Sequence, residues 1–175
     1  MSIEKAAHTL STFGGVGGRL EKIDEGQNFT VFVDFTVTPA AYEKTLSTVR
    51  DMLSDGKRLL VLTGSCGDRM KEKRPVVGEI CSRLADVMVV SNEDPYTEDP
   101  EKIIDEVLSG ANRSRCEVHR IVDRLEGIKF LLNHAHAGDI VVLCAKGSDT
   151  TMMTKHGQIP WDERKITRDL LRQRK

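Results

Sequence analysis

The sequence lacks several features that would indicate special classes of protein. Its 175 residues include four cysteines, at positions 66, 81, 116 and 144, without a C-x-x-C pair, so neither a zinc site nor a disulfide framework is indicated. No segment approaches the roughly 18 consecutive apolar residues of a membrane span, and the N-terminus lacks an apolar signal region. These absences favour a cytoplasmic protein with reduced thiols and no membrane partner.

Charge of one sign is also lacking. The 26 basic and 27 acidic side chains give a net charge of −1, which offers no basis for a nucleic-acid partner recognised through bulk charge. No G-x-x-x-x-G-K-[ST] phosphate loop occurs, which argues against a stand-alone ATPase. With 39% hydrophobic and 30% charged residues, the composition is that of an ordinary soluble globule of one domain.

Apolar runs and amphipathic helical patterns alternate along most of the chain. Because parallel strands are joined by helical crossovers, this alternation predicts an α/β fold: a Rossmann-like, mostly parallel, doubly wound sheet of about six strands with helices on both faces. Strands are expected at residues 29–35, 58–63, 87–90, 117–121 and 140–145. A helix is expected after each of the first four strands, and two of these helices are expected at residues 75–85 and 124–136.

The two ends of the chain differ from this pattern. Residues 3–13 are compatible with a short helix, and the glycine-rich residues 14–18 are typical of a hinge. Near the other end, residues 159–161 are expected to anchor in the sheet, and a charged helix over residues 162–172 is expected to cover a sheet edge.

Four polar loops follow four of the predicted strands. In a parallel sheet the carboxyl ends of the strands share one edge, which is where α/β proteins bind ligands. The longest loop, residues 63–75, combines glycines with several cations. The loops therefore predict a binding site to which these residues converge: Asp34, Asp68, Arg69, Glu93, Asp94, Lys146 and Asp149.

Several of these loop residues also have simpler interpretations. Glu98 and Asp99 are better explained as acids in the first turn of the following helix. Lys146 contacts an anion or lies in water, and Tyr96 is a packing residue or a contact at the edge of the site. The five histidines show no metal-ligand spacing with acids, so no metal ligand is assigned. No catalytic residue is assigned either.

Five segments resemble the conserved motifs of Mur ligases, in the same order. They are GVGGR (15–19), VDFTVTP (33–39), GDRMKEKRP (67–75), EDPYTEDP (93–100) and AKGSD (145–149), which resemble GVPGR, VDYAHTP, GGDRDKGKRP, DNPRTEEP and GKGHE. The match extends over nearly the whole chain and is closest to the C-terminal domain of UDP-N-acetylmuramoyl-tripeptide synthetases.

The resemblance implies a part of a three-domain enzyme. Residues 1–18 would be the end of a preceding domain and a hinge, and residues 19–175 the C-terminal domain. Such enzymes form an amide bond with ATP: the carboxylate of UDP-MurNAc-dipeptide becomes an acyl phosphate, which the amine of the incoming amino acid attacks. These enzymes act in peptidoglycan precursor synthesis. ATP and Mg²⁺ would be held mainly by the central ATPase domain, so the C-terminal domain would be inactive alone.

The same resemblance implies roles for individual residues. Arg19 would contact the nucleotide phosphates and Asp34 the ribose. Arg69 would bind the carboxylate of the incoming amino acid. The residues around the substrate side chain would be Glu93, Asp94, Tyr96, Ala145 and Asp149.

Departures from the motifs bear on the substrate. Val37 stands where the family has histidine, and Ala145, Ser148 and Asp149 replace glycine, histidine and glutamate. Tyr96 replaces the arginine that grips the far carboxylate of diaminopimelate. Because an ammonium among carboxylates is paired and a carboxylate is repelled, we expect a basic amino acid such as lysine or ornithine.

Two other functions compete with this one. The chain could be a stand-alone module that binds a nucleotide or amino acid without catalysis, although Met1 before a hinge-like segment favours a domain cut at a linker. A folate or cyanophycin ligase domain would share the architecture, but the motif at residues 67–75 argues against it.

Overall fold

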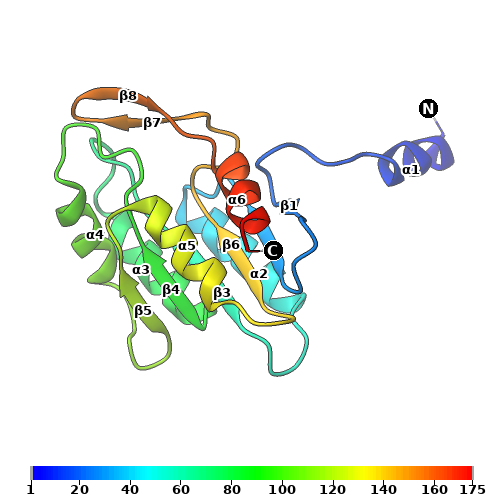
Figure 1. Cartoon of the computed structure of the whole chain (residues 1–175), viewed down its shortest axis with the longest axis horizontal. Helices are drawn as coiled ribbons and strands as arrows, with labels where there is room; N and C mark the ends of the chain where they lie inside the picture. The colour runs from blue at the N-terminus through cyan, green and yellow to red at the C-terminus, as the bar shows by residue number, and fades with distance from the viewer. Residues whose placement is uncertain (1, 175) are drawn as a thin grey trace.

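A six-stranded sheet organises the molecule, of which the computed structural model describes residues 2–174 (Figure 1). The strand order is β1-β2-β6-β3-β4-β5, and only the pairing of β1 with β2 is antiparallel. The predicted α/β fold with a mostly parallel sheet is thus confirmed. The strands are β1 (Glu21–Ile23), β2 (Thr30–Val33), β3 (Leu59–Thr63), β4 (Val87–Val90), β5 (Glu117–Arg120) and β6 (Ile140–Leu143).

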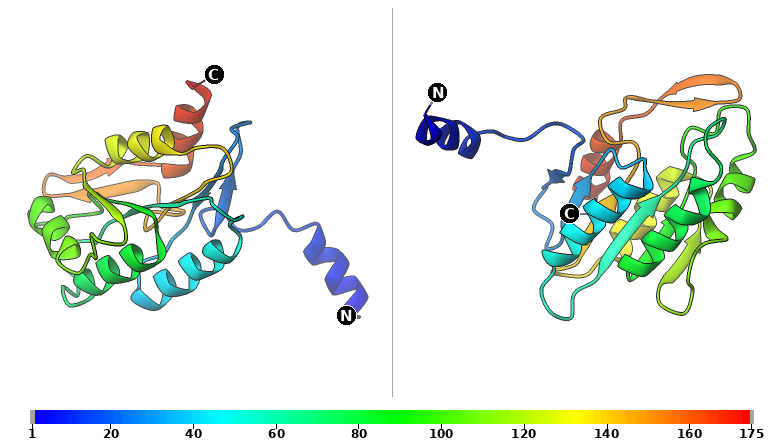
Figure 2. Two further views of the ribbon diagram at one scale, coloured as in Figure 1. Left: turned by 90° about the horizontal axis from the view of Figure 1, so that it is seen from below. Right: turned by 180° about the vertical axis from the view of Figure 1, so that it is seen from behind.

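Helices cover both faces of the sheet (Figure 2). One face packs against α2 (Pro39–Asp51), α3 (Lys73–Leu84) and α4 (Pro100–Leu108). The other face packs against α5 (Arg124–His134) and α6 (Glu163–Arg172). In β3, Leu59 and Val61 belong to the first core and Leu60 and Leu62 to the second, because successive side chains of a strand point to opposite faces.

The connections bring four loops to one edge of the sheet. The chain leaves β2 through α2 to β3 and continues outward to β4 and β5, and α5 then returns it so that β6 lies between β2 and β3. Since β2, β6, β3 and β4 run parallel, the loops that follow them all leave the same edge. This is the edge at which the sequence predicts a binding site.

Local signals explain where the helices begin. The side chain of Thr38 accepts a hydrogen bond from the backbone N–H of Ala41 at the start of α2, next to Pro39 in the first turn. Asp99 accepts from the backbone N–H of Glu101 at the start of α4, as the sequence predicts. These caps fix the points at which the loops end.

The N-terminal helix stands apart from the body of the protein (Figures 1 and 2). Helix α1 (Ile3–Ser11) confirms the predicted short helix, yet none of its residues is buried. Residues 9–17, which comprise the end of this helix and its connection to the body, are exposed as well. The large apolar side chains of this segment are therefore open to solvent: Ile3, Leu10, Phe13 and Val16.

The C-terminal part agrees only in part with expectation. Helix α6 covers the sheet edge as predicted, packing against α5 and the edge strand β1. An unpredicted hairpin, β7 (Thr151–Thr154) with β8 (Gly157–Pro160), projects from the body. The expected anchor at residues 159–161 is wrong for Ile159, which lies in β8 and is 43% exposed. Trp161 does pack against the second core.

Candidate functional site

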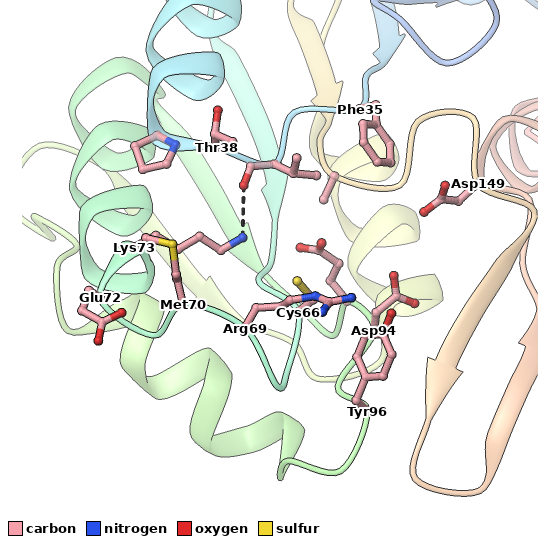
Figure 3. A pocket seen from close by; sticks show the side chains of 14 residues that line it. Phe35, Thr38, Cys66, Arg69, Met70, Glu72, Lys73, Asp94, Tyr96 and Asp149 are labelled. Carbon is pink, nitrogen blue, oxygen red and sulfur yellow. Dashed lines mark hydrogen bonds between the residues drawn. The ribbon is translucent and has the colours of Figure 1, made fainter.

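A cavity of about 760 Å³ opens at the edge where β2, β3, β4 and β6 end (Figure 3). Its walls come from the loops that follow these four strands, so it is built from segments far apart in the sequence. All six residues that the resemblance assigns to amino-acid binding line it: Arg69, Glu93, Asp94, Tyr96, Ala145 and Asp149. Their roles in binding remain predictions.

The loop after β3 is held tightly against the loop after β4. The backbone N–H of Gly67 donates to the carbonyl oxygen of Asp94 at 2.9 Å. A Cβ atom on Gly67 would lie 1.9 Å from the carbonyl oxygen of Pro95, so only glycine permits this approach. Asp68 accepts hydrogen bonds from the backbone N–H and the hydroxyl of Thr97. Asp68 therefore joins the two loops and does not line the cavity.

Arg74 anchors the base of this loop. Its side chain is fully buried and donates to Glu98, Glu106 and the carbonyl oxygen of Cys66. The hydrogen bonds from Arg74, with Lys71, lower the pKa of Glu98 to about 2. Arg74 therefore has a structural role and does not line the cavity. The prediction for Glu98 is wrong. The sequence predicts an acid that stabilises the start of α4, but the Glu98 carboxylate accepts hydrogen bonds from Arg74 in α3 and from Asp68 in the loop before α3.

Arg69 and Tyr96 face each other in the cavity (Figure 3). The guanidinium of Arg69 lies 5.4 Å from the centroid of the Tyr96 ring, a cation–π contact. Tyr96 therefore supports a cation of the cavity and is not merely a packing residue. Arg69 keeps its planar donors available for a carboxylate, which such a group binds through two parallel hydrogen bonds.

Glu93 is a buried carboxyl group in the cavity wall. It is 5% exposed. Burial is the largest influence on this group and raises its pKa to about 7, although the nearby Arg124 and Lys73 act in the opposite direction. Glu93 therefore exists in both protonation states near neutral pH.

A buried lysine holds the other two carboxylates of the cavity. Lys146 is 1% exposed, and its Nζ lies 2.7 Å from Asp94 Oδ2 and 3.1 Å from Asp149 Oδ2. The sequence leaves open whether Lys146 contacts an anion or lies in water. In the structure Lys146 does neither: it is buried, pairs with two carboxylates of the protein itself and does not line the cavity.

Arg19 and Asp34 lie outside this cavity. Arg19 is exposed, donates to the carbonyl oxygen of Phe35, and stacks 4.4 Å from the centroid of that ring. Asp34 is 9% exposed. It accepts hydrogen bonds from the backbone N–H of Leu20 and the hydroxyl of Thr36. The predicted convergence of Asp34 with the other loop acids is thus wrong, because Asp34 turns toward the chain that leaves the hinge.

Sequence reasoning missed part of the cavity wall. Phe35, Cys66, Met70, Glu72 and Lys73 line the cavity, and all of them lie inside or beside the segments that carry the motifs. Lys73 also donates from Nζ to the carbonyl oxygen of Val37, which joins the loops after β2 and β3. The apolar members had no distinguishing signal in the sequence, because such residues are equally common in cores.

Within residues 2–174, no three His, Cys, Asp or Glu side chains are grouped so that they could hold a metal ion. In the same described part of the chain, no helix combines the length and apolar character needed to cross a bilayer.

Residues 18–147 match the model of the family described as "Mur ligase, glutamate ligase domain". A relative from Syntrophomonas wolfei, UDP-N-acetylmuramoyl-L-alanyl-D-glutamate--2,6-diaminopimelate ligase, is 39% identical over 93% of this chain and 33% of its own. A UDP-N-acetylmuramyl-tripeptide synthetase from Roseiflexus sp. is also 39% identical, over 92% of this chain and 32% of its own. The chain thus spans about a third of these relatives.

Solved structures agree with the sequence comparison. A structure of a UDP-N-acetylmuramoyl-L-alanyl-D-glutamate--2,6-diaminopimelate ligase superimposes with a TM-score of 0.84 and 28% identity, over 99% of this chain and 35% of that one. The family match covers all six strands of the main sheet and three of the four cavity loops in full. The chain belongs to the Mur ligase family and corresponds to its glutamate ligase domain.

Proposed function

We propose that this chain is the C-terminal domain of an ATP-dependent ligase that adds the third amino acid to UDP-MurNAc-dipeptide in peptidoglycan precursor synthesis. The observation that carries the proposal is the cavity in which six motif residues from three loops come together, in a chain of this family. The names of the relatives support the same step. A cytoplasmic location fits, because all four cysteines are free thiols.

In this proposal the cavity binds the incoming amino acid. Arg69 would hold its carboxylate, since the guanidinium lines the cavity and Tyr96 supports it from one side. Glu93, Asp94, Ala145 and Asp149 would surround the side chain of the substrate. The domain would contribute by positioning the amine for attack, which can supply a large part of the rate enhancement of such a reaction.

The nucleotide would be bound beside this cavity, where the chain leaves the hinge. When bound, ATP would activate the carboxylate of the peptide substrate. Arg19 is exposed next to the hinge and suits a contact with phosphates. Asp34 fits a ribose only if its oxygens accept further hydrogen bonds beside those from Leu20 and Thr36. Mg²⁺ would be held mainly by the preceding domain.

Residues 1–18 would belong to the end of that preceding domain and the hinge. Helix α1 supports this division, because its apolar side chains have no partner in the described body of the chain. Packing of Leu10 and Phe13 against a central ATPase domain would bury them. The glycines at 14, 15, 17 and 18 would then allow the two domains to close over ATP.

The identity of the amino acid rests on the charges of the cavity. We keep lysine or ornithine as the first candidate, because Glu93 has no cationic partner within hydrogen-bonding distance among the described contacts, and Tyr96 supplies no positive charge. Lys146 already pairs Asp94 and Asp149, so Glu93 is the carboxyl group that a basic side chain would meet. Diaminopimelate, which carries both an ammonium and a carboxylate at its far end, is the second candidate, favoured by the name of the Syntrophomonas wolfei relative.

A ligation assay of the complete enzyme with a panel of amino acids tests the proposal. We expect ATP hydrolysis coupled to addition of a single preferred amino acid, and Arg69→Ala should raise the KM for that amino acid by about 100-fold. Lys71→Ala is the matched control, because Lys71 lies in the same loop, is exposed and does not line the cavity. Binding of amino acids without ligation would instead support a binding module without catalysis, and preference for diaminopimelate would reject the basic-substrate proposal.

A further inference from the structure

Lys146 lies behind the cavity and contacts it only through other residues. Its ammonium is placed between Asp94, from the loop after β4, and Asp149, from the loop after β6. Both carboxylates line the cavity, whereas the lysine is 1% exposed and does not. The ammonium therefore determines where two carboxylates of the cavity wall can lie.

Asp94 extends this arrangement to the hairpin. While Oδ2 of Asp94 accepts from Lys146, Oδ1 accepts from the backbone N–H of Met153 in β7 at 2.7 Å. We call Asp94, Lys146, Asp149 and Met153 the Lys146 cluster. It connects three segments that are distant in sequence: the loop after β4, the loop after β6 and the hairpin.

The backbone around the cluster adopts conformations that need external support. Asp94, Tyr96 and Ala145 have φ values of +37°, +50° and +88°, in the region that residues with a side chain rarely adopt. Such conformations cost free energy and persist when surrounding contacts determine them. The ion pairs of Lys146 bridge the two loops in which these residues lie, so they are among the contacts that hold the cavity wall in shape.

We propose that Lys146 is a positioning residue of the amino-acid site: it orients Asp94 and Asp149 and neutralises their charge without touching the substrate. The proposal rests on the proposed function of the cavity. It predicts that loss of the ammonium releases two carboxylates and loosens the attachment of β7, while the nucleotide side of the domain is unaffected. A lysine that served only the stability of the fold would not separate these effects.

The first experiment follows the hydrogen bond between Met153 and Asp94 directly in this chain. We expect Lys146→Met to speed hydrogen exchange at the backbone N–H of Met153 by about 10-fold or more, with little change at the central strand β3. Lys129→Met is the matched control, since Lys129 also pairs with an acid three positions away but lies on the surface of α5. Unchanged exchange at Met153, or an equal increase throughout the sheet, would overturn the proposal.

The second experiment uses the complete ligase. We expect Lys146→Met to raise the KM for the amino acid by about 10-fold and to leave the KM for ATP within about twofold. Equal changes in both constants, or no change in the first, would contradict a positioning role. If the methionine variant does not fold, Lys146→Gln, which keeps N–H donors without the charge, should give the same pattern with smaller changes.

A double-mutant cycle tests whether Lys146 acts through Asp149. If Lys146 acts through Asp149, the effects of Lys146→Met and Asp149→Asn on the amino-acid KM should be less than additive, and additive effects would count against the proposal. Absence of ligation by the wild-type enzyme would reject the proposed function, whereas the exchange experiment on Met153 would still decide whether Lys146 holds the loops.

Discussion

Glu93 is a carboxyl group of the cavity wall whose protonation the fold shifts toward neutral pH. Its pKa is raised to about 7, chiefly by burial, so between pH of about 4.5 and 7 the folded protein holds a proton that the unfolded chain has lost. The contribution of Glu93 to stability therefore falls as pH rises through this interval. In the cavity, a cationic substrate would favour the ionised form, which couples binding to proton release.

Replacement of Glu93 by glutamine tests this coupling. Glu93→Gln should remove the loss of stability between pH 4.5 and 7, and above pH 7 it should be more stable than the wild type by up to about 3 kcal/mol. Urea unfolding across pH 4–8 measures the difference. The surface variant Glu126→Gln should follow the wild-type curve, and a parallel curve for Glu93→Gln would show that this carboxyl is not the cause.

A second residue-scale prediction concerns Gly67. Gly67→Ala should lower the free energy of unfolding by about 1–3 kcal/mol, because the added Cβ would lie 1.9 Å from the carbonyl oxygen of Pro95. Urea denaturation of the chain measures this cost. Gly14→Ala serves as the control, since nothing lies within 4 Å of a Cβ at that position. Equal stability of the two variants would mean that the two loops separate easily.

At the scale of elements, a buried ion pair ties α5 to α6 beneath the site. Arg124 and Glu163 are nearly inaccessible to solvent and are joined by two hydrogen bonds. Arg124 also donates to the carbonyl oxygens of Asn92 and Cys144, each adjacent to a residue that lines the cavity. The two helices thus support the loops after β4 and β6 from below.

Loss of one member of this pair leaves the other charge buried without its partner. Arg124→Met should therefore destabilise the fold by about 3–5 kcal/mol, whereas the double variant Arg124→Met/Glu163→Met should recover part of that loss. Arg120→Met, which removes exposed pairs with Glu101 and Asp105, should cost less than about 1 kcal/mol. Thermal and urea unfolding distinguish these outcomes, and equal costs for the two arginines would refute the role of burial.

At the scale of the whole molecule, the two ends of the chain contribute very differently to the fold. Helix α1 buries no residue, and its connection to the body is exposed. Helix α6 buries Glu163, Thr167 and Leu171, and its arginines pair with Glu21 and Glu25, which lie close in space but near the other end of the chain. Stability should therefore depend on the C-terminal helix and not on the N-terminal one.

Truncation from each end tests this difference. Removal of residues 1–13 should leave the unfolding midpoint within about 2 °C of the intact chain, because little apolar surface is lost from the core. Removal of residues 163–175 should prevent stable folding, since Arg124 loses Glu163 and the second core loses Leu171. Scanning calorimetry measures both midpoints, and a large loss on N-terminal truncation would show that α1 packs on the body in solution.

The sequence by itself determined the architecture and the edge of the sheet at which the cavity lies. Wholly apolar runs such as residues 59–62 identify central strands, since a strand buried on both faces needs no alternation. Helical spacing and caps such as Asp99 identify the crossovers between strands. Once the strands are parallel, their carboxyl ends must share an edge, and this brought Arg69, Glu93, Asp94 and Asp149 together without knowledge of any contact.

The tertiary structure alone decided which charges are free. The sequence places Asp34, Asp68 and Lys146 among the groups that face the site. In the structure Asp34 bonds to Leu20, Asp68 to Thr97 and Lys146 to Asp94. The sequence also shows no sign of β1 or of the hairpin of β7 and β8, which are short and stabilised by pairing with a neighbouring strand. Pairing and burial depend on residues distant in sequence, so no local pattern records them.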